Sequence, residues 1–156
     1  MKFKTAFILA IIGLVLWLIV DGLQKVGNNQ GYEPDQPIAF SHKIHAGENE
    51  IQCMYCHYGS ERSRHAGIPA TSVCLNCHNK IKSKSPEIIK LKKAIADKKP
   101  IEWVKVHRLA DFAYFSHEQH VGSGKLKCQT CHGPVEKMTR MRQYSDLSMG
   151  WCLECH

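Results

Sequence analysis

All eight cysteines of this 156-residue chain fall in one five-residue pattern, Cys-x-x-Cys-His. Two thiols three positions apart can form thioether bonds to the two vinyl groups of one porphyrin, while the adjacent imidazole binds the iron as proximal ligand. The spacing therefore predicts four covalently bound c-type haems. The predicted attachment residues are Cys53, Cys56, Cys74, Cys77, Cys128, Cys131, Cys152 and Cys155, and the predicted proximal ligands are His57, His78, His132 and His156.

Two other kinds of cysteine site, a zinc site and a redox dithiol, make demands that this sequence does not meet. Four Cys-x-x-Cys pairs could make two four-cysteine zinc sites, but zinc has no need of a histidine after every second cysteine. With only ten histidines in the chain, chance does not place one after all four pairs. A redox dithiol would need one such pair near a βαβ pattern, which is missing from the sequence.

A second element, Phe-Ser-His-x-x-His, occurs at Phe40–His45 and at Phe115–His120. Each copy stands seven residues before a Cys-x-x-Cys-His motif, and an offset of 75 residues superposes both elements of the two halves. The following motifs, beginning at Cys74 and Cys152, superpose after a further shift of three residues. The chain is therefore interpreted as a duplicated two-haem unit, covering about residues 38–80 and 113–156.

The four histidines of these repeated elements are the candidate distal ligands. Histidines at positions i and i+3 leave one face of a helical turn, so each element can serve two neighbouring haems. Bis-histidine ligation typically gives a lower reduction potential than histidine–methionine ligation. The alternative is that some of these residues are surface groups. The candidates are His42, His45, His117 and His120.

For four further residues, the sequence does not decide whether they bind iron. His107 lies in an apolar stretch, Trp103–Leu109, that is predicted to be extended, and is either a ligand or a satisfied buried histidine. His65 follows a polar run and is expected to be solvated or near a haem propionate. Met141 and Met149 are conceivable sulfur ligands, although a single methionine is more often core filler.

The N-terminal segment is expected to be a membrane anchor over residues 1–25. Ala6–Val20 carries no charge, and the apolar span of about 20 residues is close to what crosses a bilayer. A cleaved signal peptide would need a small-x-small site, which the sequence does not supply well. Lys2 and Lys4 should remain cytoplasmic by the positive-inside rule. The sequence thus predicts a single-pass protein of the bacterial inner membrane, with residues 26–156 as a periplasmic tetrahaem domain.

One regular helix is expected outside the haem motifs, at about residues 85–98, joining the two repeated units. Ser85 is the expected N-cap, Pro86 the first-turn residue and Glu87 an acid that complements the helix dipole. Ile88, Leu91 and Ile95 share one face of this helix. The predicted fold class is a mostly irregular and α-helical multihaem cytochrome c fold, with few short helices, a haem-filled core and one transmembrane helix.

A formal net charge of +7 is also typical of nucleic-acid-binding proteins, with Lys80–Lys99 as the candidate basic patch. Four haems would add about eight propionate charges that this count ignores. The lysines and arginines are better interpreted as a solvated face and as propionate partners, and no nucleic acid is expected. Without haem the chain is expected not to fold.

Taken together, these elements resemble the class III multihaem cytochromes c and, more specifically, the multihaem subunit of alternative complex III. The residues that carry this resemblance are Trp103–His107, Asp111–His120, Cys131–Val135 and Met149–Cys152, together with the N-terminal anchor. The resemblance implies a non-catalytic electron carrier within a quinol:acceptor oxidoreductase. Its implied partners are iron–sulfur and polytopic quinol-site subunits, a monohaem cytochrome c and a terminal oxidase. Such subunits usually carry a fifth haem, so the chain is expected to continue beyond His156.

Two competing functions make different demands on the sequence. A stand-alone tetrahaem quinol dehydrogenase feeding a periplasmic reductase also has one anchor and four motifs, but its first motif usually has a methionine soon after the histidine. Here Tyr58-Gly59-Ser60 follows His57. A catalytic multihaem reductase needs an open iron position, and six remaining histidines for four irons argue against one.

Overall fold

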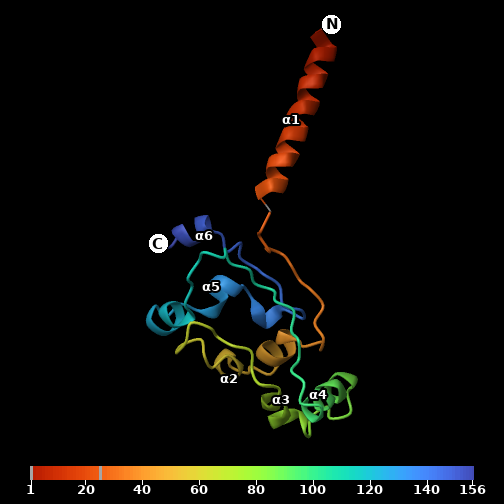
Figure 1. The fold of residues 1–156 in the computed structure, drawn as a ribbon, viewed down its shortest axis with the longest axis vertical. Helices are drawn as coiled ribbons and strands as arrows, with labels where there is room; N and C mark the ends of the chain where they lie inside the picture. The colour runs from red at the N-terminus through yellow and green to blue at the C-terminus, as the bar shows by residue number, and fades with distance from the viewer. Residues whose placement is uncertain (1, 25) are drawn as a thin grey trace.

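The computed structural model describes residues 2–24 and 26–156, so Met1 and Lys25 of the predicted anchor lie outside the described residues. Short helices joined by irregular segments build this part of the chain, and the residues described contain no β-strand (Figure 1). The mostly irregular and α-helical fold expected from the sequence is confirmed at this level. In chain order the elements are α1 (Lys2–Gln24), η1 (Lys43–Glu48), α2 (Cys53–Cys56), α3 (Thr71–His78), α4 (Pro86–Ala96), η2 (Glu118–Ser123), α5 (Cys128–His132), η3 (Val135–Lys137) and α6 (Met149–Leu153).

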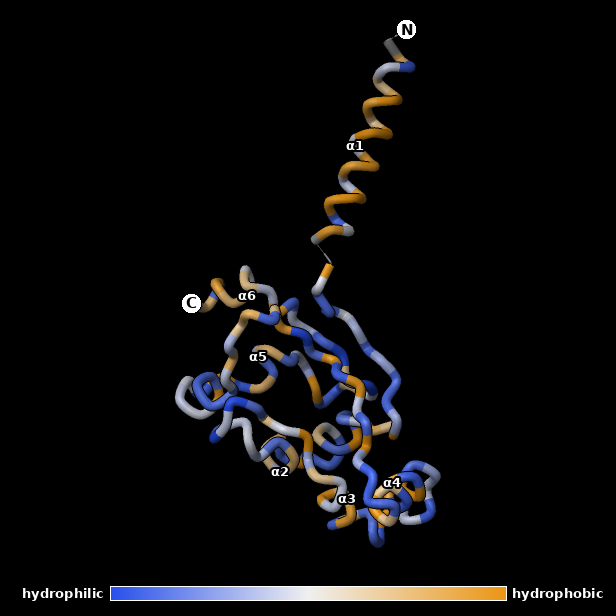
Figure 2. The backbone as a smooth tube through the Cα atoms, viewed as in Figure 1, coloured by the Kyte–Doolittle hydropathy of each residue, from blue (hydrophilic) through white to orange (hydrophobic). Residues whose placement is uncertain are grey.

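Helix α1 projects away from the rest of the chain and is apolar along nearly its whole length (Figure 2). Its 23 residues make a helix of about 34 Å, enough for a hydrocarbon core of about 30 Å. The span from Phe3 to Leu23 is the candidate membrane-crossing segment among the described residues, and none of it is buried against the protein. Apolar side chains facing outward on every side of a helix are what a lipid environment requires.

Helix α4 carries the small side-chain core. Ile88 and Leu91 are buried together with Ile38, and Ile95 and Trp103 pack against them. The shared face predicted from the sequence is therefore confirmed.

The start of α4 differs in its capping from what the sequence suggested. The Ser85 side chain makes no capping hydrogen bond. The Glu87 carboxylate instead accepts hydrogen bonds from the Ala39 amide, at 2.9 Å, and from the Lys90 ammonium group, at 2.7 Å. Glu87 thus ties the beginning of the helix to the segment that leads into the first Phe-Ser-His-x-x-His element.

The two repeated halves pack against each other reciprocally. In the first half, the Lys43 amide at the start of η1 donates to the Met138 carbonyl at 2.9 Å. In the second half, the Glu118 amide at the start of η2 donates to the Ser63 carbonyl at 3.1 Å. Lys43 and Glu118 are equivalent under the 75-residue offset, and so are Ser63 and Met138. Each bond therefore joins the same two positions of the repeat, with the donor in one half and the acceptor in the other.

Two glycines make this close approach possible. The backbone of Gly47 in η1 lies against the Glu136 carbonyl, and that of Gly122 in η2 lies against the Glu61 carbonyl, so that a Cβ at either glycine would collide with an oxygen. These pairs are also equivalent under the 75-residue offset. Each half therefore presents its histidine-bearing turn to the loop that follows the first haem motif of the other half.

Candidate haem-binding site

The four Cys-x-x-Cys-His motifs begin on the short helices α2, α3, α5 and α6; His57 follows the end of α2, and Cys155 and His156 follow the end of α6. Residues i and i+3 share one side of a helical turn, so this geometry turns both thiols of a motif in the same direction. The α6 turn is fixed by the Ser148 hydroxyl, which accepts a hydrogen bond from the Trp151 amide at 3.2 Å. The helices are short because each has to present only two thiols and one imidazole.

Three of the predicted proximal histidines face a predicted distal histidine across a gap of about 6 Å. Two imidazoles bound on opposite sides of one iron, with metal–nitrogen bonds of about 2 Å, have ring centres about 6 Å apart. The observed pairs therefore have the spacing of a bis-histidine site. They are His45 with His78 (6.0 Å between ring centres, 61° between planes), His117 with His132 (6.4 Å, 4°) and His120 with His156 (5.8 Å, 76°).

The remaining distal candidate, His42, lies near His57. Burial lowers the pKa of His42 to about 4, and the next largest cause is the neighbouring His57 ring. The Nδ1 atom of His42 is buried and, among the described residues, finds no hydrogen-bond partner. Because a buried polar atom without a partner costs about 1–3 kcal/mol, this ring suits a site where a group other than the polypeptide completes its bonding.

Five of the predicted ligand histidines direct Nδ1 to a main-chain carbonyl oxygen. When Nδ1 carries the proton and donates it to a carbonyl, the Nε2 lone pair is left free to bind a metal. The donor arrangement thus fits haem iron at each of these rings. The bonds are His45 to Ser41 (2.8 Å), His120 to Ser116 (2.8 Å), His117 to Arg64 (3.1 Å), His57 to Gly67 (2.7 Å) and His78 to Ile81 (3.0 Å).

The most buried rings are also kept uncharged. Burial, followed by the neighbouring His107, His117, His57 and His42 rings, lowers the pKa of His132 to about 4. Desolvation disfavours the imidazolium form, and nearby rings that can themselves become charged disfavour it further. At neutral pH, His42 and His132 therefore offer the neutral imidazole that metal binding needs.

The thiols connect neighbouring motifs in a definite order. Burial and the nearby Cys74 raise the pKa of Cys56, so the first and second motifs are neighbours. Burial and the nearby Cys53, which also forms a side-chain hydrogen bond, raise the pKa of Cys128, so the first and third motifs are neighbours. Burial and the nearby Cys155 and Cys152 raise the pKa of Cys131, so the third and fourth motifs are neighbours.

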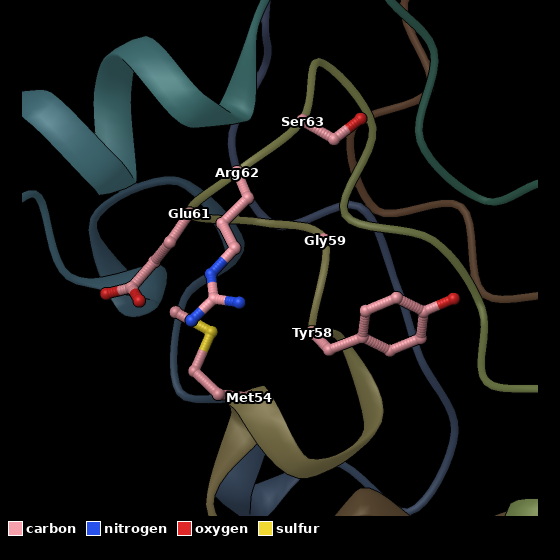
Figure 3. Close-up of a pocket in the computed structure, with 6 residues that line it drawn as sticks. All are labelled: Met54, Tyr58, Gly59, Glu61, Arg62 and Ser63. Atoms are coloured by element: carbon pink, nitrogen blue, oxygen red, sulfur yellow. The ribbon is translucent and has the colours of Figure 1, made fainter.

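A cavity of about 490 Å³ lies beside the first motif, lined by Met54, Tyr58, Gly59, Glu61, Arg62 and Ser63. Figure 3 shows the Arg62 guanidinium group reaching down beside Met54, while the Tyr58 ring points to the other side. The buried Ser60 hydroxyl lies 2.8 Å from both the Met54 sulfur and the His57 carbonyl oxygen, and so fixes the start of this loop. An arginine at this position is suited to pair with a carboxylate such as a haem propionate.

The residues left open by the sequence lie in different surroundings. The His107 Nε2 atom is 3.1 Å from Nδ1 of His132, with the two rings at right angles. His65 is exposed and lies outside the ring pairs described above. Met149 is exposed and Met141 is half-buried.

The Nδ1 partners of the predicted ligand histidines were missed by the sequence analysis. Ser41 and Ser116 could have been found, because each stands four residues before its histidine within the repeated element. Arg64 and Gly67 could not, because their carbonyls reach His117 and His57 through the path of a loop.

The comparisons with known proteins agree with this geometry. Residues 21–111 match the Class III cytochrome C family. The chain is also similar to a protein of Nitratidesulfovibrio vulgaris (strain Hildenborough) described as "Menaquinone reductase, multiheme cytochrome c subunit". The two are 32% identical over 144 residues, covering 80% of this chain and 69% of the relative. Repeated haem-attachment motifs, paired imidazoles and these matches together establish that the chain belongs to the class III cytochrome c family and binds several c-type haems.

Proposed function

We propose that this chain is the electron-carrying multihaem cytochrome c subunit of a membrane quinone oxidoreductase. The observation that carries the proposal is the set of imidazole pairs about 6 Å apart, each pairing a motif histidine with a histidine of a Phe-Ser-His-x-x-His element. Such sites are saturated by protein ligands, which suits electron carriage rather than substrate binding at iron. The relative described as a menaquinone reductase subunit supports the same class of complex.

The chain's own residues would hold four haems in this function. The eight motif cysteines attach them, the motif histidines bind one side of each iron, and the other side is bound by His42, His45, His117 and His120. The pairing we propose follows the repeat, so that the first histidine of each element serves the first motif of its half and the second histidine serves the second. Haem at these sites supplies one-electron exchange between ferric and ferrous iron.

The attachment sites are proposed to form one line, in the order second, first, third and fourth motif. The thiol neighbours Cys56–Cys74, Cys53–Cys128 and Cys131–Cys155 support this order. In Figure 1 the corresponding helices α3, α2, α5 and α6 follow one another across the molecule. The outer sites, on α3 and α6, would then be the places where electrons enter and leave.

Helix α1 is proposed to anchor the chain in the bacterial inner membrane, with residues 26–156 in the periplasm. Lys2 and Lys4 precede the apolar span, and covalent haem attachment takes place outside the cytoplasm. The proposed partners are an iron–sulfur subunit, polytopic quinol-site subunits and a monohaem cytochrome c, with a terminal oxidase as a further acceptor. This set corresponds to alternative complex III, in which electrons run from quinol to the acceptor. The name of the relative indicates the opposite direction.

Purification of the tagged full chain from its native membrane tests the proposal. We expect it to remain in the membrane after carbonate extraction, to carry four haems by pyridine haemochrome analysis and intact mass, and to co-purify with large membrane subunits. Menaquinol-dependent reduction of its haems would favour alternative complex III, and haem-dependent reduction of menaquinone would favour the reverse direction. A chain that purifies alone would favour the stand-alone quinol dehydrogenase, and fewer than four haems would contradict the proposed ligand set.

A further inference from the structure

His132 differs from the other motif histidines in what its Nδ1 atom contacts. Nδ1 of His57 and of His78 faces a main-chain carbonyl, as described above. Nδ1 of His132 instead faces a side chain, the Nε2 atom of His107, at 3.1 Å. The rings are 4.5 Å apart between centres and 89° between planes, and the 3.1 Å contact joins the two ring nitrogens as a hydrogen bond.

The tautomers of the two rings follow from the haem site. If His132 binds iron through Nε2, its proton is on Nδ1, and it must donate to His107. His107 Nε2 then accepts, which places the His107 proton on its own Nδ1. With its Nε2 occupied in this way, His107 is not the ring that binds an iron, whereas His117 faces His132 in nearly parallel planes across 6.4 Å.

The segment that carries His107 is held on both sides. The Val106 carbonyl accepts from the Asn29 side chain at 3.3 Å, and the Arg108 amide donates to Gln143 Oε1 at 2.8 Å. Gln143 is fully buried, and its amide group also donates to the Asp146 carbonyl at 3.0 Å. Because the neighbours on either side of His107 are fixed by side chains from distant segments, the position of its ring is fixed as well.

We infer that His107 is a positioning residue that accepts the Nδ1 hydrogen of His132 and thereby lowers the reduction potential of the haem held at the third motif. A neutral imidazole nitrogen is a more basic acceptor than an amide carbonyl, so it draws the His132 proton further and makes His132 a stronger donor to iron. A stronger donor stabilises ferric over ferrous iron. The inference rests on the proposed haem site at His132.

Redox titration of the full-length, haem-loaded chain and of its His107→Phe variant tests this inference. We expect four low-spin haems in both proteins and a rise in one midpoint potential, corresponding to about a tenfold larger equilibrium constant for reduction, or 59 mV for one electron. The shifted haem should be the one with nearly parallel axial rings, whose rhombic EPR signal differs from that of crossed rings. His107→Gln retains an acceptor and should recover part of the shift.

The controls separate this role from the alternatives. His65→Phe replaces an exposed histidine and should leave all four potentials unchanged. If His107→Phe does not accumulate, His107→Met also removes the imidazole acceptor and should raise the same midpoint potential. A new high-spin haem in the His107 variants would identify His107 as an iron ligand and overturn the inference, as would four unchanged potentials. Failure of the haem sites themselves would appear independently, as a haem count below four in the unaltered chain.

Discussion

In each Phe-Ser-His-x-x-His element, the phenylalanine and the serine of the element itself contact the second histidine ring. Phe40 stacks on His45 at 4.3 Å between ring centres and 24° between planes, and Phe115 stacks on His120 at 4.5 Å and 29°. The serine carbonyl four residues earlier takes the Nδ1 hydrogen in both copies. The phenylalanine and the serine therefore recur with the histidines because they fix the plane and the tautomer of the proposed ligand.

Replacement of His120 by alanine should open one axial position without releasing haem, since the thioether bonds remain. We expect an unchanged haem count, with about one quarter of the haem becoming high-spin and able to bind carbon monoxide. Optical and EPR spectra before and after addition of carbon monoxide measure this. His65→Ala is the matched control and should remain fully low-spin; a His120→Ala protein that also stays low-spin would remove His120 from the ligand set.

Among the secondary-structure elements, the two halves are joined by reciprocal contacts, in which the histidine-bearing turn of each half packs on a loop of the other half. The η1 turn packs on the loop after the third motif, and the η2 turn packs on the loop after the first. The same interface supplies the Arg64 carbonyl to His117, so a proposed ligand of one half is oriented by a loop of the other. The two-haem unit defined by the repeat is thus not an independent structural unit.

Gly47→Ala should destabilise the haem-loaded protein by about 1–3 kcal/mol, because its Cβ would meet the Glu136 carbonyl and push the halves apart. Thermal or denaturant unfolding followed by the haem absorption band measures the change. Gly150→Ala is the control, because the nearest atom to a Cβ there is the Ser148 hydroxyl at 3.6 Å, and it should change stability by no more than about 1 kcal/mol. Equal stability of the two variants would contradict the reciprocal packing.

Helix α4 offers a second test at this scale. Leu91 is 4% exposed and belongs to the cluster that packs on Cys74 and Leu75 of the second motif, so Leu91→Ala should cost about 2–5 kcal/mol. Ile89, on the opposite face, is 55% exposed, and Ile89→Ala should stay within about 0.5 kcal/mol. Urea unfolding of both variants distinguishes them. A small effect of Leu91→Ala would mean that the helix is not part of the core.

At the scale of the whole molecule, side-chain burial is sparse. In the described part of the chain the buried apolar residues are Ile38, Ile88, Leu91, Val106 and Met138. So few buried side chains cannot offset the conformational entropy of more than a hundred ordered residues. The haems must therefore supply most of the buried apolar surface, and their propionates would also offset much of the +7 charge of the polypeptide.

Residues 26–156 produced in a compartment without haem attachment should consequently be unfolded. We expect a far-UV circular dichroism spectrum without helical signal and rapid proteolysis. The haem-loaded domain should resist the same protease. A cooperative thermal transition in the haem-free chain would show that the polypeptide folds by itself and would contradict this prediction.

Local features followed from the order of residues alone. The cysteine spacing gave the attachment motifs, and the 75-residue offset gave the duplication. The apolar run of α1, and Pro86 with the shared apolar face of α4, gave these two helices. These features depend on neighbours within one or two helical turns, where spacing along the chain fixes spacing in space.

Tertiary structure alone decided which groups meet across the chain. It set His117 opposite His132, brought the Arg64 carbonyl to His117, interlocked the two turns through Gly47 and Gly122, and turned His107 toward His132. From the sequence, His107 could be either a ligand or a satisfied buried histidine. Its position beside His132 depends on the irregular path of residues 101–110 and on the distant Asn29 and Gln143 side chains that hold this segment, and no periodic pattern encodes such contacts.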